Sequence, residues 1–429
     1  MKVLMLGWEY PPHISGGLGT ACEGLSKALS YQNIKIDFIV PQVHGGENAD
    51  HMSLIDTTSI NNKSVSASSE IPGLRQLGIP AHLQPYMRPE QYSCESTSET
   101  KIEHKRSDRI SVLSPVQTKP NKNIHYGQNI FDEVARYAQK IIQSFQHTAA
   151  DVIHAHDWMT FPAGVALSKL TGKPLVIHIH SLESDRSGQG VNSQIHEIEK
   201  MASHFAHRII TVSNYTANLV VNNHGVSREK IKTVHNGVMQ DHYGIQNQPD
   251  IKKTKNVLFL GRVTFQKGPD YFVEAAAKVI PHVPDAKFIL AGSGDMLGRM
   301  IERVAELGLS KNFSFPGFVI GDELKQIYAS ADLYVMPSVS EPFGIAPLEA
   351  INHNTPVLLS KQSGVGEVIN HALKFDFWDV NRLAELIIAA LNYEEIRQDL
   401  LAMSQQEVRR IRWENAAHKT IQIYNEMVN

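Results

Sequence analysis

Cysteine and long apolar runs are scarce in this sequence of 429 residues. Its two cysteines, Cys22 and Cys94, are too few for a disulfide framework, which fits a reducing compartment. No apolar run reaches the roughly 18 residues that a membrane-spanning helix needs, and the N-terminal MKVLMLGW leads into a strand pattern without a signal-peptide cleavage site. We therefore expect a cytoplasmic protein whose membrane contact is at most peripheral.

An excess of charge of one sign is also lacking. The 41 basic and 44 acidic residues leave a net charge of -3, which gives no reason to expect a nucleic-acid partner, so any phosphate site must be local. With 42% hydrophobic and 20% charged residues, the composition is typical of a soluble globular protein. The length predicts two domains of about 200 residues each.

Strand and helix patterns alternate through both halves of the chain. The first half begins with the apolar strand KVLMLG, a loop, an amphipathic helix over about 20–31 and the strand IKIDFIV. This order starts a parallel, doubly wound α/β sheet. A second series of the same kind begins at NVLFLG, so two such sheets are expected to face each other across a central cleft.

Two polar stretches interrupt these patterns. Residues 44–123 are rich in Ser, Thr, Asn and charge, which predicts a surface insertion with a hairpin or two, although part of it could shape an acceptor site. The polar run YGIQNQPDIKKTKN is interpreted as a linker between domains at 1–240 and 250–408. The helix pattern near 409–429 follows the completed second sheet and is expected to pack back on the first domain.

The stretch SVSEPFGIAPLEA, residues 338–350, places two carboxylates around a turn and a helix start. A buried-strand pattern precedes it, and Glu341 and Glu349 lie on either side of the turn. The backbone N–H groups of Gly344 and Ile345 have no acceptor at a helix start and suit a phosphate. The alternative is that Glu349 only complements the helix dipole and Glu341 is a solvated loop charge.

Two cations follow the first strand of the second half, in GRVTFQKG. Ligands of such sheets bind at the carboxyl ends of strands, so Arg262 and Lys267 would lie beside the loop of Glu341. An Arg fork and a Lys ammonium can neutralise a diphosphate leaving group. The alternative is two exposed loop cations.

Glycines and histidines mark the strand ends of the first half. Gly16, Gly17 and Gly19 join a strand to a helix without a full dinucleotide-binding pattern, and they suit either a close approach to a phosphate or sugar or a turn with positive φ. The strand-end sequences IHAHDW and IHIHS hold two pairs of histidines.

Within each pair, His154 with His156 and His178 with His180, the side chains share one face of the strand. This spacing occurs in metal sites, so a metal-dependent hydrolase is a competitor, but histidines bonded within the core are commoner. His180 and Asp157 end their strands and are better placed to touch a substrate.

Together these motifs resemble a known family. GRVTFQKG followed by SEPFGIAPLE is similar to the donor site of retaining GT-B glycosyltransferases of family 4, the group 1 glycosyltransferases, whose mark is two glutamates eight positions apart. WEYPPHISGGLGTACEGLSKAL, DVIHAHDW and HNGV resemble the glycogen and starch synthase branch more particularly. The resemblance covers most of the chain apart from 44–123 and implies the GT-B fold, in which two Rossmann-like domains face a cleft.

The resemblance implies a donor site on the second domain. Arg262 and Lys267 would bind the diphosphate of a nucleotide sugar, UDP- or ADP-glucose. Glu349 would hold the ribose hydroxyls, and the amides of Gly344 and Ile345 would also contact the donor. No cofactor and no metal is implied, because the two cations and the helix amides supply the electrostatic stabilisation.

The resemblance also implies residues around the reacting sugar. Glu341 would lie beside the transferred sugar, and His180 matches a histidine near it. Asp157 matches an aspartate close to the acceptor side, and Gly17 and Asn236 match positions that line the sugar and phosphate from the other wall. The sugar configuration would be retained through front-face departure and attack, with a carbohydrate or glycolipid as acceptor.

One position departs from the synthase branch. Ser15 stands where that branch has the lysine of a KxGGL pattern, so one charged contact to donor or acceptor is missing. Elongation of an α-glucan is therefore one expectation beside transfer to another glycan or to a glycolipid. A sugar-nucleotide epimerase and a non-catalytic nucleotide-sugar binder are further alternatives.

Overall fold

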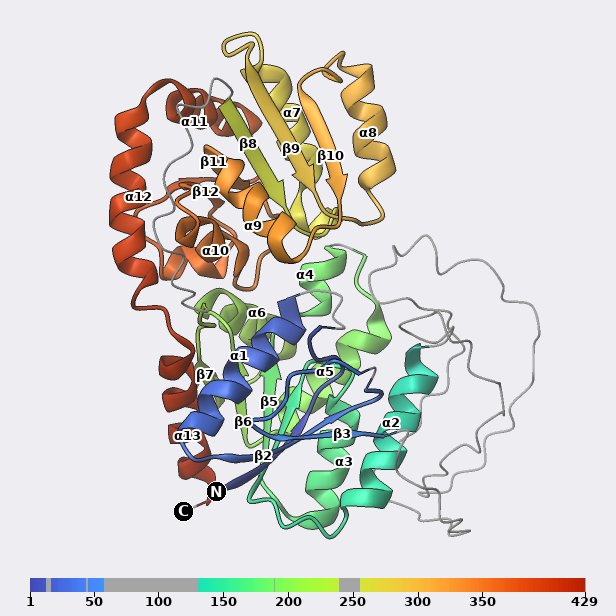
Figure 1. Cartoon of the computed structure of the whole chain (residues 1–429). Helices are drawn as coiled ribbons and strands as arrows, with labels where there is room; N and C mark the ends of the chain where they lie inside the picture. Colours follow the sequence, from blue (N-terminus) through green and yellow to red (C-terminus); the bar gives the residue numbers. More distant parts are fainter. Residues whose placement is uncertain (13–16, 44, 58–129, 189, 239–254, 429) are drawn as a thin grey trace, which may run out of the picture.

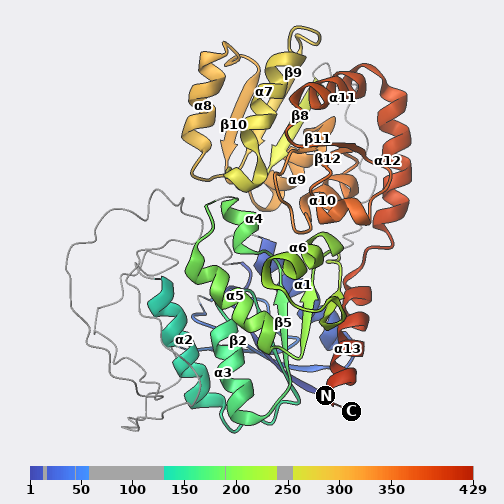
Figure 2. The same cartoon turned by 180° about the vertical axis from the view of Figure 1, so that it is seen from behind.

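The chain folds into two parallel β-sheets that are each covered by helices on both faces and that lie one above the other (Figure 1, Figure 2). This computed structural model describes residues 1–12, 17–43, 45–57, 130–188, 190–238 and 255–428. The predicted fold class, two Rossmann-like parallel-sheet domains, is confirmed.

The N-terminal sheet has seven strands in the order β3-β2-β1-β4-β5-β6-β7. Its strands are β1 Lys2–Leu6, β2 Lys35–Val40, β3 Ser53–Asp56, β4 Val152–His156, β5 Leu175–Ile179, β6 Arg208–Thr211 and β7 Ile231–Thr233. The helices around it are α1 Gly17–Tyr31, α2 Ile130–Phe145, α3 Phe161–Thr171, α4 Glu183–Ser187, α5 Ser193–Phe205 and α6 Asn214–His224, with the short turn η2 Arg228–Lys230.

The C-terminal sheet has six strands in the order β10-β9-β8-β11-β12-β13. Its strands are β8 Lys255–Leu260, β9 Ala286–Ala291, β10 Phe313–Gly317, β11 Leu333–Met336, β12 Val357–Ser360 and β13 Leu373–Phe375. Its helices and short 3-10 turns are η3 Phe265–Lys267, α7 Pro269–Val279, α8 Leu297–Glu306, α9 Gly321–Ser330, α10 Ala346–Asn352, η4 Gly364–Glu367, α11 Val380–Asn392 and α12 Glu394–Val408.

The strands are apolar on both faces because both faces are buried. In β1, Leu4 and Leu6 pack on the side of α2 and α3, whereas Val3 and Met5 pack on the side of α1. The C-terminal sheet is likewise buried between two separate apolar clusters. This double cover of the central strands leaves the strand ends, with the loops that follow them, as the place for polar chemistry.

The last helix, α13 Trp413–Val428, returns to the N-terminal sheet and packs beside α1 (Figure 1). Its Trp413 ring fills the space over Gly24, where an added Cβ would lie 2.2 Å from Cε2 of the ring. We propose domain limits of 1–240 and 250–408, with 409–429 assigned to the first domain. The connecting run at 239–254 lies outside the described residues.

The predicted insertion at 44–123 begins too early. Ser53–Asp56 forms β3, which pairs in parallel with β2 and is the edge strand of the N-terminal sheet. Its side chains are only partly buried, so the strand carries a weak hydrophobic pattern, and the polar flanks hide it. Residues 58–129 lie outside the described residues.

Helix α13 begins at Trp413 rather than near residue 409, and three elements before it, β13, α11 and α12, were not predicted from the sequence. Within the described ranges, no helix is both long enough and apolar enough to cross a membrane.

Candidate active site

The candidate residues gather where the carboxyl ends of the two sheets meet. Asp157 and His180 follow β4 and β5 of the N-terminal sheet, whereas Lys267 and Glu341 follow β8 and β11 of the C-terminal sheet. The loops after these strands are in contact, because Ser340 Oγ donates a hydrogen bond to Asp185 Oδ1 at 2.6 Å. Helix α4 lies between the two sheets at this seam (Figure 1).

An ion pair at the carboxyl end of the C-terminal sheet joins Lys267 to Glu341. The Lys267 ammonium donates to Oε2 of Glu341, and Ser338 Oγ donates to the same oxygen at 3.3 Å. The Glu341 side chain is 7% exposed and that of Lys267 is 23% exposed. The carboxylate is therefore held inside the loop, while the cation lies at its rim, where an incoming anion can reach it.

Arg262 is linked through Gln266 to the loop that carries Glu341. The guanidinium Nη2 donates to Gln266 Oε1 at 3.2 Å, and the backbone carbonyl of Gln266 accepts a bond of 2.9 Å from the amide of Val339. The loop after β8 and the loop after β11 thus form one unit. The structure brings Arg262, Lys267 and Glu341 together, as the strand-end argument predicts.

Gly344 makes the turn between Glu341 and α10. Its φ of +97° is a conformation that L side chains rarely adopt, and an added Cβ would lie 3.2 Å from Cγ of Glu341. Ile345 follows at the N-cap position of α10 and packs against apolar clusters of both sheets. The turn therefore lies directly at the contact of the two domains.

Glu349 lies in α10 and accepts a hydrogen bond of 2.9 Å from the Tyr328 hydroxyl at Oε2. Burial raises the pKa of Glu349, although the Tyr328 hydroxyl and His353 lower it in part. Tyr328 orients this carboxylate and was not predicted from the sequence, because nothing in the helix pattern of α9 distinguishes it from a core residue.

Asp157 holds the loop that carries His180. Its φ is +58°, and its Oδ1 accepts the amide of His180 at 2.7 Å and that of Ser181 at 3.4 Å. Burial raises the pKa of Asp157 to about 6, even though Arg186 and these two amides lower it. The carboxylate is thus engaged with backbone, and its contact with an acceptor remains a prediction.

The four strand-end histidines form a stack on one face of β4 and β5, as their spacing predicts. Ring centroids lie 4.3 Å apart for His154 and His156 and 4.1 Å apart for His178 and His180. His156 Nδ1 is 3.0 Å from His180 Nε2, and burial lowers the pKa values of His154 and His180 to about 3. The stack is therefore uncharged at neutral pH.

The stack also bears on the metal alternative. His154, His156 and His178 each offer a ring nitrogen, and these nitrogens lie within 4.8 Å of one another. The rings of His154 and His178 are only 9° from parallel, and those of His154 and His156 are 23° from parallel. Ligands of one ion direct in-plane lone pairs at a common centre, whereas stacked rings direct them nearly side by side. We therefore interpret the stack as packing.

Gly17 and Asn236 lie at the other edges of the seam. Gly17 opens α1, is exposed, and has no described atom within 4 Å of an added Cβ, while Ser15 and Gly16 lie outside the described residues. Asn236 is buried between His235 and Gly237. His235 Nε2 lies 2.9 Å from Glu367 of η4 in the C-terminal domain, so the segment of Asn236 contacts both domains.

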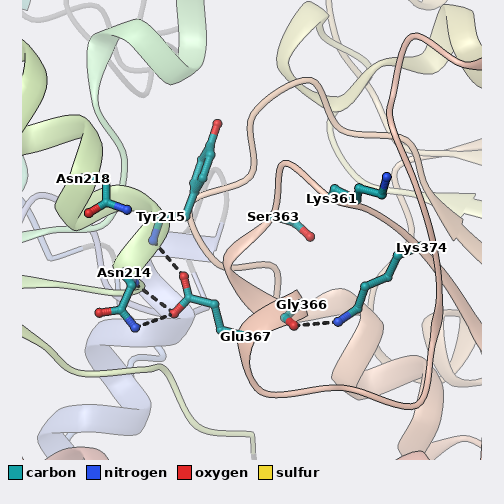
Figure 3. A pocket seen from close by; sticks show the side chains of 8 residues that line it. All are labelled: Asn214, Tyr215, Asn218, Lys361, Ser363, Gly366, Glu367 and Lys374. Carbon is teal, nitrogen blue, oxygen red and sulfur yellow. Dashed lines mark hydrogen bonds between the residues drawn. The ribbon is translucent and has the colours of Figure 1, made fainter.

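A cavity of about 480 Å³ lies at the same seam, between α6 and the loops around η4 (Figure 3). In it, Glu367 accepts hydrogen bonds from Asn214 and Tyr215, and Lys374 Nζ donates to the Gly366 carbonyl at 2.7 Å. None of the predicted site residues lines this cavity. Its lining consists of Asn214, Tyr215, Asn218, Lys361, Ser363, Gly366, Glu367 and Lys374.

Two Rossmann-like domains that meet at the carboxyl ends of their strands define the GT-B class of fold. Residues 2–233, more than half of the chain, match the family model described as the starch synthase catalytic domain, and residues 244–406 match the model described as group 1 glycosyl transferases. The chain belongs to the starch synthase catalytic domain family and is a glycosyltransferase.

Curated relatives match along the whole chain. An uncharacterized glycosyltransferase of Methanocaldococcus jannaschii is 29% identical and covers 99% of this chain and 98% of its own length. A glycogen synthase of Mycobacterium tuberculosis is 23% identical, with 99% and 94% covered.

Solved structures share the fold. Sucrose-phosphate synthase from Thermosynechococcus elongatus has a TM-score of 0.71 at 17% identity over 99% of this chain and 98% of that one. The Anabaena protein HepE, solved in complex with UDP-glucose, has a TM-score of 0.69 at 17% identity over 99% and 100%.

Proposed function

We propose that this glycosyltransferase is a retaining enzyme that moves glucose from UDP- or ADP-glucose to the end of an α-glucan. The observation that carries the proposal is the Lys267–Glu341 contact at the carboxyl end of the C-terminal sheet, beside the loop that leads from His180. It combines a cation for a leaving diphosphate with a carboxylate for a sugar, at the edge where parallel sheets bind ligands.

Charge neutralisation is the proposed task of the two cations. A departing nucleoside diphosphate gains negative charge in the transition state, and preorganised cations stabilise that charge. Lys267 would exchange its contact with Glu341 for a phosphate oxygen, and Arg262, steadied by Gln266, would provide a forked donor. Glu349, oriented by Tyr328, would accept from the ribose hydroxyls. This division needs neither a cofactor nor a metal.

On the opposite wall, His180 would contact the reacting sugar as a neutral imidazole. Its Nε2 is occupied by His156, while its Nδ1 is buried without a hydrogen-bond partner among the residues that the structure describes. A bound sugar hydroxyl would satisfy that nitrogen. Asp157 fixes the backbone of the same loop, and retention would follow from departure and attack on one face of the sugar.

The relatives support a glucose donor. Two classes of acceptor are left to test, an α-glucan and a small carbohydrate or glycolipid. The glycogen synthase match covers 94% of that protein, and HepE was solved with UDP-glucose, which favours glucose as the transferred sugar. D-inositol 3-phosphate glycosyltransferases are also similar, one of them at 28% identity over 64% of this chain. The second candidate is therefore transfer to a small carbohydrate or a glycolipid. We propose a cytoplasmic reaction with membrane contact at most peripheral.

A donor screen followed by product analysis tests the proposal. Nucleotide sugars are first ranked by the rise in melting temperature that each produces, because ligand binding stabilises the folded state. The best donor is then incubated with glycogen, with short maltooligosaccharides and with glycolipid acceptors, and released nucleotide and product anomer are measured. Release of UDP or ADP with an α-linked product on glycogen is expected.

Three other outcomes would overturn the proposal. Conversion of the donor without an acceptor would indicate an epimerase. Donor stabilisation without any turnover would indicate a nucleotide-sugar binder, and loss of activity on addition of a chelator would indicate a metal-dependent reaction. Turnover with a small carbohydrate or glycolipid alone would favour the second candidate.

A further inference from the structure

Ser340, the residue directly before Glu341, is held by two side chains of the N-terminal domain. Its hydroxyl donates to Asp185 Oδ1 at 2.6 Å, and the Tyr215 hydroxyl lies 2.9 Å from Ser340 Oγ. Because the single hydroxyl proton of Ser340 goes to the carboxylate, Tyr215 must be the donor of the second bond. We call Asp185, Ser340 and Tyr215 the clasp.

Asp185 is held within its own domain as well as by Ser340. Its side chain is buried, and its second oxygen, Oδ2, accepts the amide of Leu182 at 2.7 Å at the start of α4. Both oxygens are therefore fixed. Burial raises the pKa of Asp185, whereas the Ser340 hydroxyl, the Leu182 amide and Arg186 lower it in part and favour the carboxylate form that accepts these bonds. Since Leu182 is two residues after His180, Asp185 connects the loop of His180 to the loop of Glu341.

Tyr215 is fixed by the C-terminal domain as well. It lies in the first turn of α6, where its amide donates to Glu367 Oε1 at 2.7 Å and the amide of Asn214 donates to Glu367 Oε2 at 2.9 Å (Figure 3). A carboxylate at a helix start complements the helix dipole. Glu367 thus locks the start of α6 against the C-terminal sheet and sets the position from which Tyr215 reaches Ser340.

Glu341 itself has its main chain bound within its own domain. Its amide donates to the Gln362 carbonyl at 2.9 Å, and its carbonyl accepts from the Gly364 amide at 2.9 Å. Its side chain is held by Lys267 and Ser338. Ser340, the residue that the clasp holds, lies between Val339 and Glu341, whose main chains are both bonded within the C-terminal domain.

We propose that Asp185 and Tyr215 act through Ser340 as positioning residues that orient Glu341 toward the reacting sugar when the two domains approach. The inference rests on the proposed function, in which Glu341 faces that sugar. It adds a specific coupling: the loop of His180 and the loop of Glu341 are aligned by one hydroxyl, so closure of the domains and alignment of the reacting groups occur together.

The test compares Ser340→Ala, Ser340→Thr and Tyr215→Phe with the wild type in glucosyl transfer. Ser340→Ala should lower kcat by about 10- to 100-fold, since a hydrogen bond to a charged group is lost. The Kd for the free nucleotide should stay close to wild type, and the melting temperature should fall by only a few degrees, because the buried Asp185 side chain loses one of its partners. Ser340→Thr keeps the hydroxyl and should recover most of the rate, and Tyr215→Phe should cost less than Ser340→Ala.

Ser184→Ala is the matched control. Ser184 lies on α4 beside Asp185, but its hydroxyl accepts a bond of 3.2 Å from Asn223 inside the N-terminal domain, so this variant should keep the wild-type kcat. An active wild type together with an equally active Ser340→Ala overturns the clasp alone. Equal losses in Ser340→Ala and Ser340→Thr also overturn it. A wild type without turnover on any nucleotide sugar overturns the proposed function and the clasp with it.

Discussion

The N-terminal wall of the seam carries a buried and uncharged histidine stack, whereas the C-terminal wall keeps a cation within reach of solvent. Burial lowers the pKa of His180 to about 3 and raises that of Asp157 to about 6. Across the seam, Lys267 lies partly exposed against Glu341. The proposed function uses this difference, with hydrogen bonding to sugar on one wall and neutralisation of phosphate on the other.

The cause of the difference is position relative to the sheet. His154, His156 and His178 lie on strands that helices cover on both faces, and removing an ionised group from water costs several kcal/mol. Such groups become neutral instead. Lys267 and Glu341 lie in loops beyond the strand ends, where water and a ligand can approach. The predictions below test whether charge matters on the C-terminal wall and neutrality on the other.

The largest effect is expected from Lys267→Ala. If the ammonium neutralises the leaving diphosphate, its loss should raise the barrier by about 3 kcal/mol, which is on the order of a 100-fold loss in kcat/KM. The measurement is initial-rate kinetics with the best donor. The control is Lys325→Ala, since Lys325 is an exposed partner of Asp322 on α9. An unchanged rate in Lys267→Ala would show that the charge of Lys267 does not contribute to the reaction.

Glu341→Gln should produce the next largest effect, about 2 kcal/mol in turnover, since it removes a charged hydrogen-bond partner beside the transferred sugar. Donor affinity should change little, whereas Glu349→Gln should mainly weaken donor binding, because that carboxylate is assigned to the ribose. Calorimetric Kd values and kcat for both variants decide the matter. The opposite pattern would show that the two glutamates have exchanged roles.

Much of this site follows from the sequence because its parts are local. Arg262, Lys267 and Glu341 lie in loops that follow apolar strand patterns, and parallel strands bring their carboxyl ends to one edge. The eight-residue spacing of Glu341 and Glu349 is likewise a short-range feature. The resemblance then supplied the class, and the comparisons confirm a group 1 glycosyltransferase with a starch synthase catalytic domain, whereas retention of configuration stays a prediction.

What the sequence did not predict depends on distant partners. Ser340 and Asp185 are 155 positions apart, and Tyr215 and Ser340 are 125 apart, so no local pattern predicts the clasp. The edge strand β3 was missed because an edge strand is only half-buried and its alternation is weak. The histidine pairs were predicted to share a face, but their neutrality depends on the burial that α1 and α13 provide.

The buried neutral histidines predict that the folded state loses stability in acid, and His178→Phe should reduce this loss. Burial lowers the pKa of His178 well below 6.5, so below that pH the unfolded chain binds a proton that the folded chain does not. The wild type therefore loses stability as pH falls through about 6.5. Between pH 7 and pH 5 this one group accounts for about 2 kcal/mol, which the variant should no longer lose.

Urea unfolding at both pH values measures this difference. The exposed His282 provides the control, because His282→Phe should leave the loss of unfolding free energy between pH 7 and pH 5 unchanged. An equal loss of unfolding free energy in wild type and His178→Phe would mean that His178 is protonated in the folded protein. The N-terminal wall would then not be neutral at this residue.

Gly344→Ala should have the smallest effect, about 1 kcal/mol in unfolding free energy, and it tests whether the charged wall depends on its turn. At φ +97° an alanine is strained, and its Cβ would press on Cγ of Glu341 from 3.2 Å. The matched control is Gly298→Ala in α8, where no described atom lies within 4 Å of the added Cβ and a helical alanine should stabilise the protein. If the strain displaces Glu341, the activation free energy calculated from kcat should rise in Gly344→Ala by more than the free energy of unfolding falls. Wild-type kcat in a destabilised Gly344→Ala would show that the turn supports the fold without orienting the carboxylate.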